Sequence, residues 1–215
     1  QSMALSCSTP QDVTKVIEDN GLQFIDLKFT DLFGQWQHFS VPVDFYDEED
    51  LFSAGLGFDG SSVRGFSVVR ESDLRLFLDW GTFKWLPRDV FGPGKVMVYG
   101  LIKGIDGSTY QSDMRGRLKS FIEELHEREG YTTNISVECE GFLFQGLEAE
   151  QRYNSRDGFK LVSSGGYYHS LPKDPLKLFI DALAEAQRAL GFENEKDHPE
   201  VAPSQFELKY KYTNA

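Results

Sequence analysis

The spacing of apolar positions predicts a first helix that begins after Thr9 and ends at Asn20-Gly21. Thr9 is a good helix N-cap, Pro10 stands at the first helical position, and Asp12 follows three residues after the cap. Gly21 favours the left-handed conformation that ends many helices. The apolar stripe consists of Val13, Val16 and Ile17.

Alternating polar and apolar residues follow in two short segments, 22–29 and 35–41, around a glycine-containing turn. This pattern is typical of a β-hairpin. The acidic run 44–51 is interpreted as a short helix. Two later segments, 74–79 and 95–101, are interpreted as strands joined by a Pro/Gly-rich connection. Residues 9–108 are therefore predicted to form a small α+β domain with a mostly antiparallel sheet.

A second α/β domain is predicted over residues 109–215. Ser112 or Asp113 can cap a helix from Met114 to about Arg128. A third helix is predicted from Asp174-Pro175 to Gly191. The apolar stripes are Met114, Leu118, Phe121, Ile122 and Leu125 in one helix, and Leu176, Phe179, Ile180, Leu183 and Leu190 in the other.

An acid-bearing strand lies between these two helices. Side chains of a strand alternate between its faces, so Glu138 and Glu140 share one face while Val137 and Cys139 point to the other. Two carboxylates on one face repel each other and lose hydration when buried. A hard divalent cation such as Mg²⁺ or Mn²⁺ would stabilise them. The alternative is a solvated acidic face, and the pair alone does not separate the two interpretations.

Three other stretches carry candidate chemistry, and each has a plain structural alternative. The small-residue segment 57–66 contains Asp59 and Ser62 and can be a surface loop or a loop that approaches a ligand. Near the C-terminus, Glu200 and Glu207 bracket a proline-containing turn, although single glutamates are more often surface residues. His198 is interpreted as a solvated histidine.

Composition narrows the function classes. The 215 residues carry a formal net charge of −12, which argues against a nucleic-acid or anionic-membrane surface. The two cysteines, Cys7 and Cys139, form no disulfide framework or zinc cluster, so a cytoplasmic protein is expected. No transmembrane segment or signal peptide is expected. Residues 1–8 are interpreted as a tag remnant and flexible N-terminus, because Gln1-Ser2-Met3 is typical of a protease-site remnant before an initiator methionine.

Four segments in this order resemble the glutamine synthetase family, class I type, over the chain from about Asp12 onward. Residues 58–62 (Phe-Asp-Gly-Ser-Ser) resemble that family's loop between subunits, and residues 138–144 resemble its metal-binding strand E-P-E-F-F-L-F. Residues 165–167 (Gly-Gly-Tyr) resemble its G-G-Y-F segment, and residues 198–207 resemble H-H-E-V-A-x-G-Q-x-E.

The resemblance implies an α+β fold: a β-grasp-like N-terminal domain followed by part of an α/β catalytic domain, a half-barrel. It implies ATP-dependent synthesis of glutamine from glutamate and ammonium through γ-glutamyl phosphate, with two Mg²⁺ or Mn²⁺ ions. A ring-shaped homo-oligomer is also implied. By position the resemblance assigns one metal to Glu140, Glu200 and Glu207, and the second metal to Glu138. It assigns the ammonium pocket to Asp59, Ser62, Tyr167 and Glu200. Of these, Asp59, Glu200 and Tyr167 are the implied catalytic residues, and Asp59 draws a proton from ammonium. Nucleotide contacts are assigned to Glu195 and Tyr212.

The sequence also departs from the family pattern. Cys139 replaces a proline, Gly141 an aromatic residue, Met114 a proline and Pro199 a histidine. The chain ends at Ala215, whereas family members continue for about as many residues again, with a metal-binding histidine, a further metal carboxylate, the glutamate-binding loop and phosphate-binding arginines. A fragment that is inactive alone is therefore expected. Two alternatives are a γ-glutamyl ligase for another amine and a non-catalytic structural relative.

Overall fold

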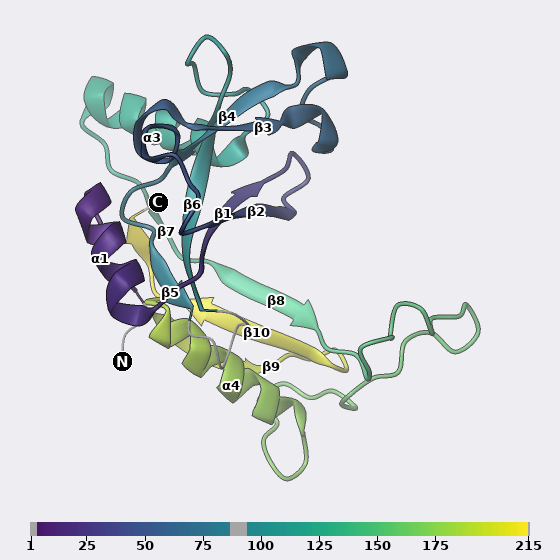
Figure 1. The fold of residues 1–215 in the computed structure, drawn as a ribbon. Helices are drawn as coiled ribbons and strands as arrows, with labels where there is room; N and C mark the ends of the chain where they lie inside the picture. Colours follow the sequence, from purple (N-terminus) through teal and green to yellow (C-terminus); the bar gives the residue numbers. More distant parts are fainter. Residues whose placement is uncertain (1–3, 87–93, 215) are drawn as a thin grey trace. The chain divides into compact units, whose positions relative to one another are not determined.

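The computed structural model describes residues 4–86 and 94–214 (Figure 1). These residues form two compact units, 4–132 and 133–214. The division falls after the second predicted helix, later in the chain than the predicted domain boundary at 108/109. Residues 1–3, to which the tag interpretation refers, lie outside the described residues.

A twisted sheet forms the centre of the first unit. Its strands lie in the order β2 (Trp36–Pro42), β1 (Phe24–Thr30), β6 (Lys95–Lys103), β4 (Asp73–Leu78) and β3 (Leu56–Asp59), and β5 (Lys84–Leu86) also pairs with β6. Strands β1 and β6 are parallel and the other pairs are antiparallel. The predicted hairpin and the predicted strands 74–79 and 95–101 are thereby confirmed. Their inward side chains form one core, which includes Ile25, Leu27, Leu76, Val96, Val98 and Ile102.

Helix α1 (Pro10–Asn20) has the predicted capping box. The Asp12 backbone N–H donates to Thr9 Oγ1 at 3.2 Å, while the Asp12 carboxylate accepts from the Thr9 N–H at 2.9 Å. Gly21 ends the helix with φ 58°. Hydrogen bonds from the Ser8 backbone and from Thr9 lower the pKa of Asp12. The charged cap therefore stabilises the fold fully above pH about 4, and this contribution is lost as the pH falls through the lowered pKa.

We expect Thr9→Ala to lower the free energy of unfolding of the first unit by about 0.5–2 kcal/mol, because it removes the N-cap acceptor. Denaturant unfolding followed by tryptophan fluorescence measures this loss, since all three tryptophans belong to this unit. Gln11→Ala is the matched control in the same exposed turn. An equal effect of both substitutions would contradict the capping assignment.

The N-terminal segment differs from the flexible terminus that was expected. The Leu5 backbone N–H donates to the Phe83 carbonyl at 3.0 Å, and Cys7 is buried in the core. The described part of this segment is therefore packed.

The predicted helix over 44–51 is confirmed only in its last part. Residues 48–54 are helical, and the turn Asp50–Ala54 is followed by Gly55. Leu51 is buried within this turn.

Helix α3 (Met114–Glu129) follows the prediction in its limits, but its apolar stripe is not buried. Leu118 and Phe121 are 50% and 60% exposed. The helix is attached to the sheet of the first unit through polar contacts at its start. Asp113 Oδ2 accepts from the Ile102 N–H of β6 at 2.8 Å, and Arg115 bonds Asp79 at 2.6 Å.

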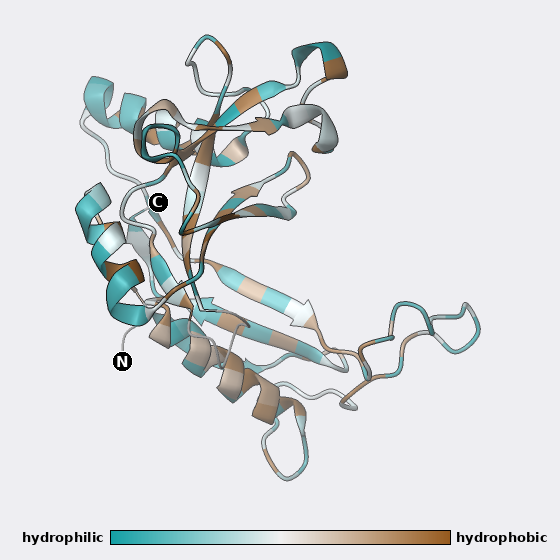
Figure 2. Ribbon diagram, viewed as in Figure 1, coloured by the Kyte–Doolittle hydropathy of each residue, from teal (hydrophilic) through white to brown (hydrophobic). Residues whose placement is uncertain are grey.

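The second unit contains a three-stranded antiparallel sheet in the order β8 (Glu138–Phe142), β10 (Gln205–Tyr210) and β9 (Asn194–Pro199). Helix α4 (Leu176–Ala189) contacts β9 and β10, and Figures 1 and 2 show this largely hydrophobic helix along the sheet. Asp174 Oδ1 accepts from the Leu176 N–H at 3.0 Å, as the predicted helix start requires. The small core comprises Leu176, Ile180, Ala184 and Leu208.

Two shorter strands, β7 (Asn134–Ile135) and β11 (Thr213–Asn214), pair at the ends of this unit. Among all the described residues, no helix combines the length and the apolar character needed to cross a membrane.

Candidate metal and substrate site

One face of the sheet in the second unit gathers acidic side chains. Strand pairing places Glu207 opposite Glu140 on β8 and opposite His198 on β9. Residues paired across antiparallel strands share a face, so all three lie on one side of the sheet. Leu208 lies on the other side and packs in the core with α4. The predicted alternation of β8, with both glutamates on one face, agrees with this register.

Two of these side chains, those of His198 and Glu207, converge with that of Glu200 into a candidate cation site. His198, Glu200 and Glu207 each offer a ligand atom, and these atoms lie within 4.8 Å of one another. The His198 Nε2 atom is 3.6 Å from Glu207 Oε2, and His198 Nδ1 is 3.8 Å from Glu200 Oε1. His198 and Glu207 are both buried. We call these three residues the His–Glu cluster.

Glu207 has a raised pKa within this cluster. A hydrogen bond with Glu200 and burial raise the pKa of Glu207, and the negative charge of Glu138 adds to this effect. A divalent cation placed between these carboxylates would offset their mutual repulsion. Carboxylate oxygens are the ligands that Mg²⁺ and Mn²⁺ prefer, so the two glutamates of the cluster fit such an ion.

The structure leaves the two β8 glutamates outside this cluster. Lys209 Nζ lies 3.2 Å from Glu138 Oε1, and Gln205 Nε2 donates to Glu140 Oε2 at 2.8 Å. Of the four predicted metal ligands, the structure therefore brings together Glu200 and Glu207. Glu140 lies directly opposite Glu207 in the register, within reach of the same site by side-chain rotation.

The interpretation of His198 as a solvated residue is wrong. Its ring is buried and contacts the rings of Tyr167 and Tyr168 at centroid distances of 4.8 and 5.1 Å. A hairpin centred on the Ala202-Pro203 turn would have placed residue 198 opposite residue 207, and this signal was available in the sequence.

Tyr167 lies beside the cluster, with its ring against that of His198. A hydrogen bond with Tyr168, burial and the negative charges of Tyr168, Glu200 and Glu207 raise the pKa of Tyr167 to about 12. Its hydroxyl therefore stays protonated at neutral pH and can donate a hydrogen bond.

The two predicted nucleotide-contacting residues are exposed. Glu195 belongs to β9, and Tyr212 follows the end of β10. The pairing of β10 with β9 shifts register between Lys209 and Tyr210. This irregularity lies between Glu207 and Tyr212, which therefore do not follow one regular alternation of faces.

Asp59 and Ser62 belong to the first unit. Asp59 ends β3, and its carboxylate accepts from Ser61 Oγ and Ser62 Oγ, both at 2.6 Å, and from the Ser61 N–H at 2.9 Å. These hydrogen bonds lower the pKa of Asp59, and the bond from the Ser61 side chain has the largest effect. The loop therefore holds Asp59 as an anion.

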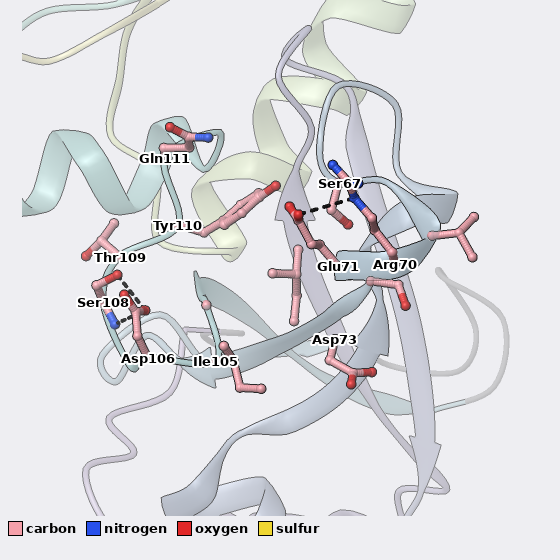
Figure 3. Close-up of a pocket in the computed structure, with 14 residues that line it drawn as sticks. Ser67, Arg70, Glu71, Asp73, Ile105, Asp106, Ser108, Thr109, Tyr110 and Gln111 are labelled. Atoms are coloured by element: carbon pink, nitrogen blue, oxygen red, sulfur yellow. Dashed lines mark hydrogen bonds and ion pairs between the residues drawn. The ribbon is translucent and has the colours of Figure 1, made fainter.

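A groove of about 460 Å³ lies beside Asp59 and is lined also by Asp73, Arg75 and Ile105. Figure 3 shows the adjoining groove of about 690 Å³, which shares Asp73 and Ile105 with the first. Glu71 and Asp106 also line this larger groove. The surface next to Asp59 is therefore polar and rich in acidic groups.

We expect Ser61→Ala to raise the pKa of Asp59 toward its ordinary value, because the largest stabilising contact of the carboxylate is lost. Carboxyl ¹³C NMR titration measures the change. Asp106 offers a matched control, since Ser108 holds it through the same pair of contacts, at 3.0 Å from N–H and 2.7 Å from Oγ. Ser108→Ala should shift Asp106 and leave Asp59 unchanged, and a shift of Asp59 in both variants would contradict the assignment.

Two protein-family models match this chain, one in each of two consecutive parts. A model described as glutamine synthetase, beta-Grasp domain, matches residues 21–102, and one described as glutamine synthetase, catalytic domain, matches residues 111–215. The chain belongs to the glutamine synthetase family. The family and the predicted β-grasp-like and half-barrel fold are thereby confirmed.

Individual relatives agree with this result. Glutamine synthetase of Methanosarcina mazei is 34% identical over 96% of this chain and 44% of its own length. Glutamine synthetase of Staphylococcus aureus strain Mu50 is 31% identical over 96% of this chain and 45% of its own length. The chain therefore spans slightly less than half of the curated relatives it matches.

Solved structures support the fold. A Plasmodium falciparum glutamine synthetase superposes with a TM-score of 0.73 at 20% identity, over 98% of this chain and 46% of that one. A structure described as apo GmaS without ligand superposes with a TM-score of 0.73 at 21% identity, over 95% of this chain and 46% of that one.

Proposed function

We propose that this chain supplies the N-terminal domain and the first metal-binding strands of an ATP-dependent glutamate–ammonia ligase. The reaction forms glutamine through γ-glutamyl phosphate and serves nitrogen assimilation. The observation that carries the proposal is the His–Glu cluster, in which two carboxylates and an imidazole converge on one sheet face. Family membership makes ligase chemistry the expected use of such a site.

Glu200 and Glu207, with His198, would hold one Mg²⁺ or Mn²⁺ ion, and Glu140 would join them from β8. Glu138 would contribute to a second site. Such an ion supplies positive charge beside a transferring phosphoryl group. The side chains themselves confine this charge to a partly buried face where it is weakly screened.

Ammonium must lose a proton before it can act as a nucleophile. Glu200 and Asp59 would attract the cation as anions, and Tyr167 would donate from its protonated hydroxyl. Ser62 would support Asp59, whose carboxylate it already contacts. Glu195 and Tyr212 would contact the nucleotide, the latter by stacking on adenine.

Asp59 and Ser62 would act on the site of a neighbouring copy in a homo-oligomer, as the family resemblance implies. We infer a cytoplasmic protein without nucleic-acid or membrane partners, in keeping with its acidic charge and with two cysteines that form no disulfide. The chain alone is expected to form no glutamine, because it spans less than half of its relatives.

Calorimetric titration of the 215-residue chain with Mn²⁺ tests the metal assignment. We expect Mn²⁺ to bind at one site per chain, the His–Glu cluster. The second site has only Glu138 as a ligand in this chain, so overall binding of divalent ions should be weakened. Two tight sites, or none, would contradict the assignment. An assay with glutamate, ammonium, ATP and Mg²⁺ tests the activity: turnover by this chain alone would overturn the fragment interpretation, and in any longer protein containing it Glu140→Ala should abolish glutamine formation.

A further inference from the structure

Two buried serines join the loop 160–168 to the turn before β10. Ser204 Oγ accepts from the backbone N–H groups of Val162 and Ser163, at 2.6 and 3.1 Å. In return, Ser163 Oγ accepts from the N–H groups of Ser204 and Gly165, at 3.2 and 3.3 Å. Ser204 is 0% exposed and Ser163 is 9% exposed. We call Ser163 and Ser204 the serine pair.

The backbone at Ser204 is unusual for a residue with a side chain. Its φ of 61° lies in the left-handed region, where glycine is accommodated at lower cost. Both serine hydroxyls nevertheless accept two hydrogen bonds each in a buried place. The geometry therefore gives the Ser204 hydroxyl a definite use that offsets the unfavourable backbone conformation.

The loop that the serine pair holds leads directly to the His–Glu cluster. Gly165 lies so close to the turn that an added Cβ would stand 2.9 Å from the Val201 carbonyl oxygen. Two residues later, the rings of Tyr167 and Tyr168 lie against His198. The contacts at residues 162–165 fix the backbone just before the two tyrosines, so they restrict where the tyrosine rings can lie relative to His198.

We propose that the serine pair is a positioning element of the metal and amine site, which keeps Tyr167 and Tyr168 against His198 and so forms the wall of the site over Glu200 and Glu207. The nature of the site rests on the proposed function. The ring contacts do not, so the two ideas can fail separately. Neither serine touches the cluster itself through any contact described above, and both act through the loop.

NMR of the full chain tests this role with Ser204→Gly and Ser163→Ala. In the parent chain, ring currents from the two tyrosines should displace the His198 ring protons, and Mn²⁺ bound at the cluster should broaden the Tyr167 ring signals. Ser204→Gly suits the left-handed conformation and removes the whole side chain, including the hydroxyl that accepts the two hydrogen bonds. Both variants should keep Mn²⁺ affinity within about threefold, while the His198 displacement is lost and the Tyr167 broadening decreases. Variants His198→Gln and Tyr167→Phe assign the signals.

Two matched variants separate positioning from general loosening. Ser163→Thr keeps the hydroxyl and should keep both signatures, and Ser164→Ala alters an exposed neighbour and should do the same. Unchanged signatures in Ser204→Gly and Ser163→Ala would overturn the proposal. A tenfold loss of Mn²⁺ affinity in these variants would also overturn it, because the pair would then support the ligands themselves. If the parent chain binds no Mn²⁺, the proposed function fails, while the His198 displacement still decides the role of the serine pair.

Discussion

Replacing Glu207 with glutamine is expected to lower the Mn²⁺ affinity of the chain by more than about 100-fold. The side chain is buried, faces both His198 and Glu200, and belongs to the only group of three converging potential ligands found among the described residues. Loss of even an outer-sphere partner costs 10–100-fold in known sites, so loss of a direct ligand should cost at least the upper value. Calorimetry with Mn²⁺ measures the change.

The same substitution has a second expected effect in the metal-free chain. Glu200 and burial already raise the pKa of Glu207, which shows that its charged form is disfavoured. A neutral glutamine should therefore leave the metal-free fold at least as stable at neutral pH, while Mn²⁺ no longer raises the melting temperature. Glu150→Gln, an exposed acid of the same unit, is the matched control. Unchanged Mn²⁺ affinity in Glu207→Gln, or an equal loss in Glu150→Gln, would refute the cluster as the binding site.

Leu208→Ala is expected to destabilise the second unit by about 2–5 kcal/mol. Leu208 is fully buried in the central strand β10 and packs in a core with only three other buried residues. Truncation removes buried apolar area and leaves a cavity in a core too small to redistribute the loss. Hydrogen exchange of peptides from residues 133–214 measures the effect on this unit alone.

Leu178→Ala provides the matched control for this truncation. It makes the same change on α4, but the side chain is 61% exposed, so the expected loss is below about 1 kcal/mol. Equal acceleration of exchange in the two variants would show that Leu208 is not a packing centre. Loss confined to the first unit would contradict the assignment of this core.

Local chemistry explains which parts of the fold could be predicted from sequence. The cap at Thr9, the stop at Gly21 and the helix start at Asp174 are each determined by neighbouring residues, and all three occur as expected. The hairpin 22–41 likewise depends on alternation and one turn. These signals need no information about distant parts of the chain.

Predictions that depended on tertiary surroundings were less successful. The acidic run 44–51 predicted a helix, but the helical residues are 48–54, around the buried Leu51. The stripe of α3 correctly identified an apolar face without revealing that Leu118 and Phe121 would remain exposed. A hydrophobic pattern identifies a face and does not identify what covers it.

In the candidate site, too, features set by local sequence could be predicted and features set by tertiary contacts could not. Strand alternation predicted that Glu138 and Glu140 share a face, and the register agrees. It could not predict that Lys209 and Gln205 would hold these carboxylates away from the cluster, since cross-strand partners are known only once register is known. The burial of His198, by contrast, was missed although a hairpin centred on the Ala202-Pro203 turn already places it opposite Glu207.

Strand β10 carries Glu207 and Leu208 as immediate neighbours, one toward the carboxylates and one toward α4. A shift of this strand by one residue would exchange their faces, placing a charge in the apolar core and a leucine among ligands. The free-energy cost of burying the charge adds to that of losing the packed leucine, so the shifted register is strongly disfavoured. Insertion or deletion of a single residue within Gln205–Tyr210 should consequently remove folding and metal binding together, whereas length changes in distant exposed loops can be absorbed without either loss.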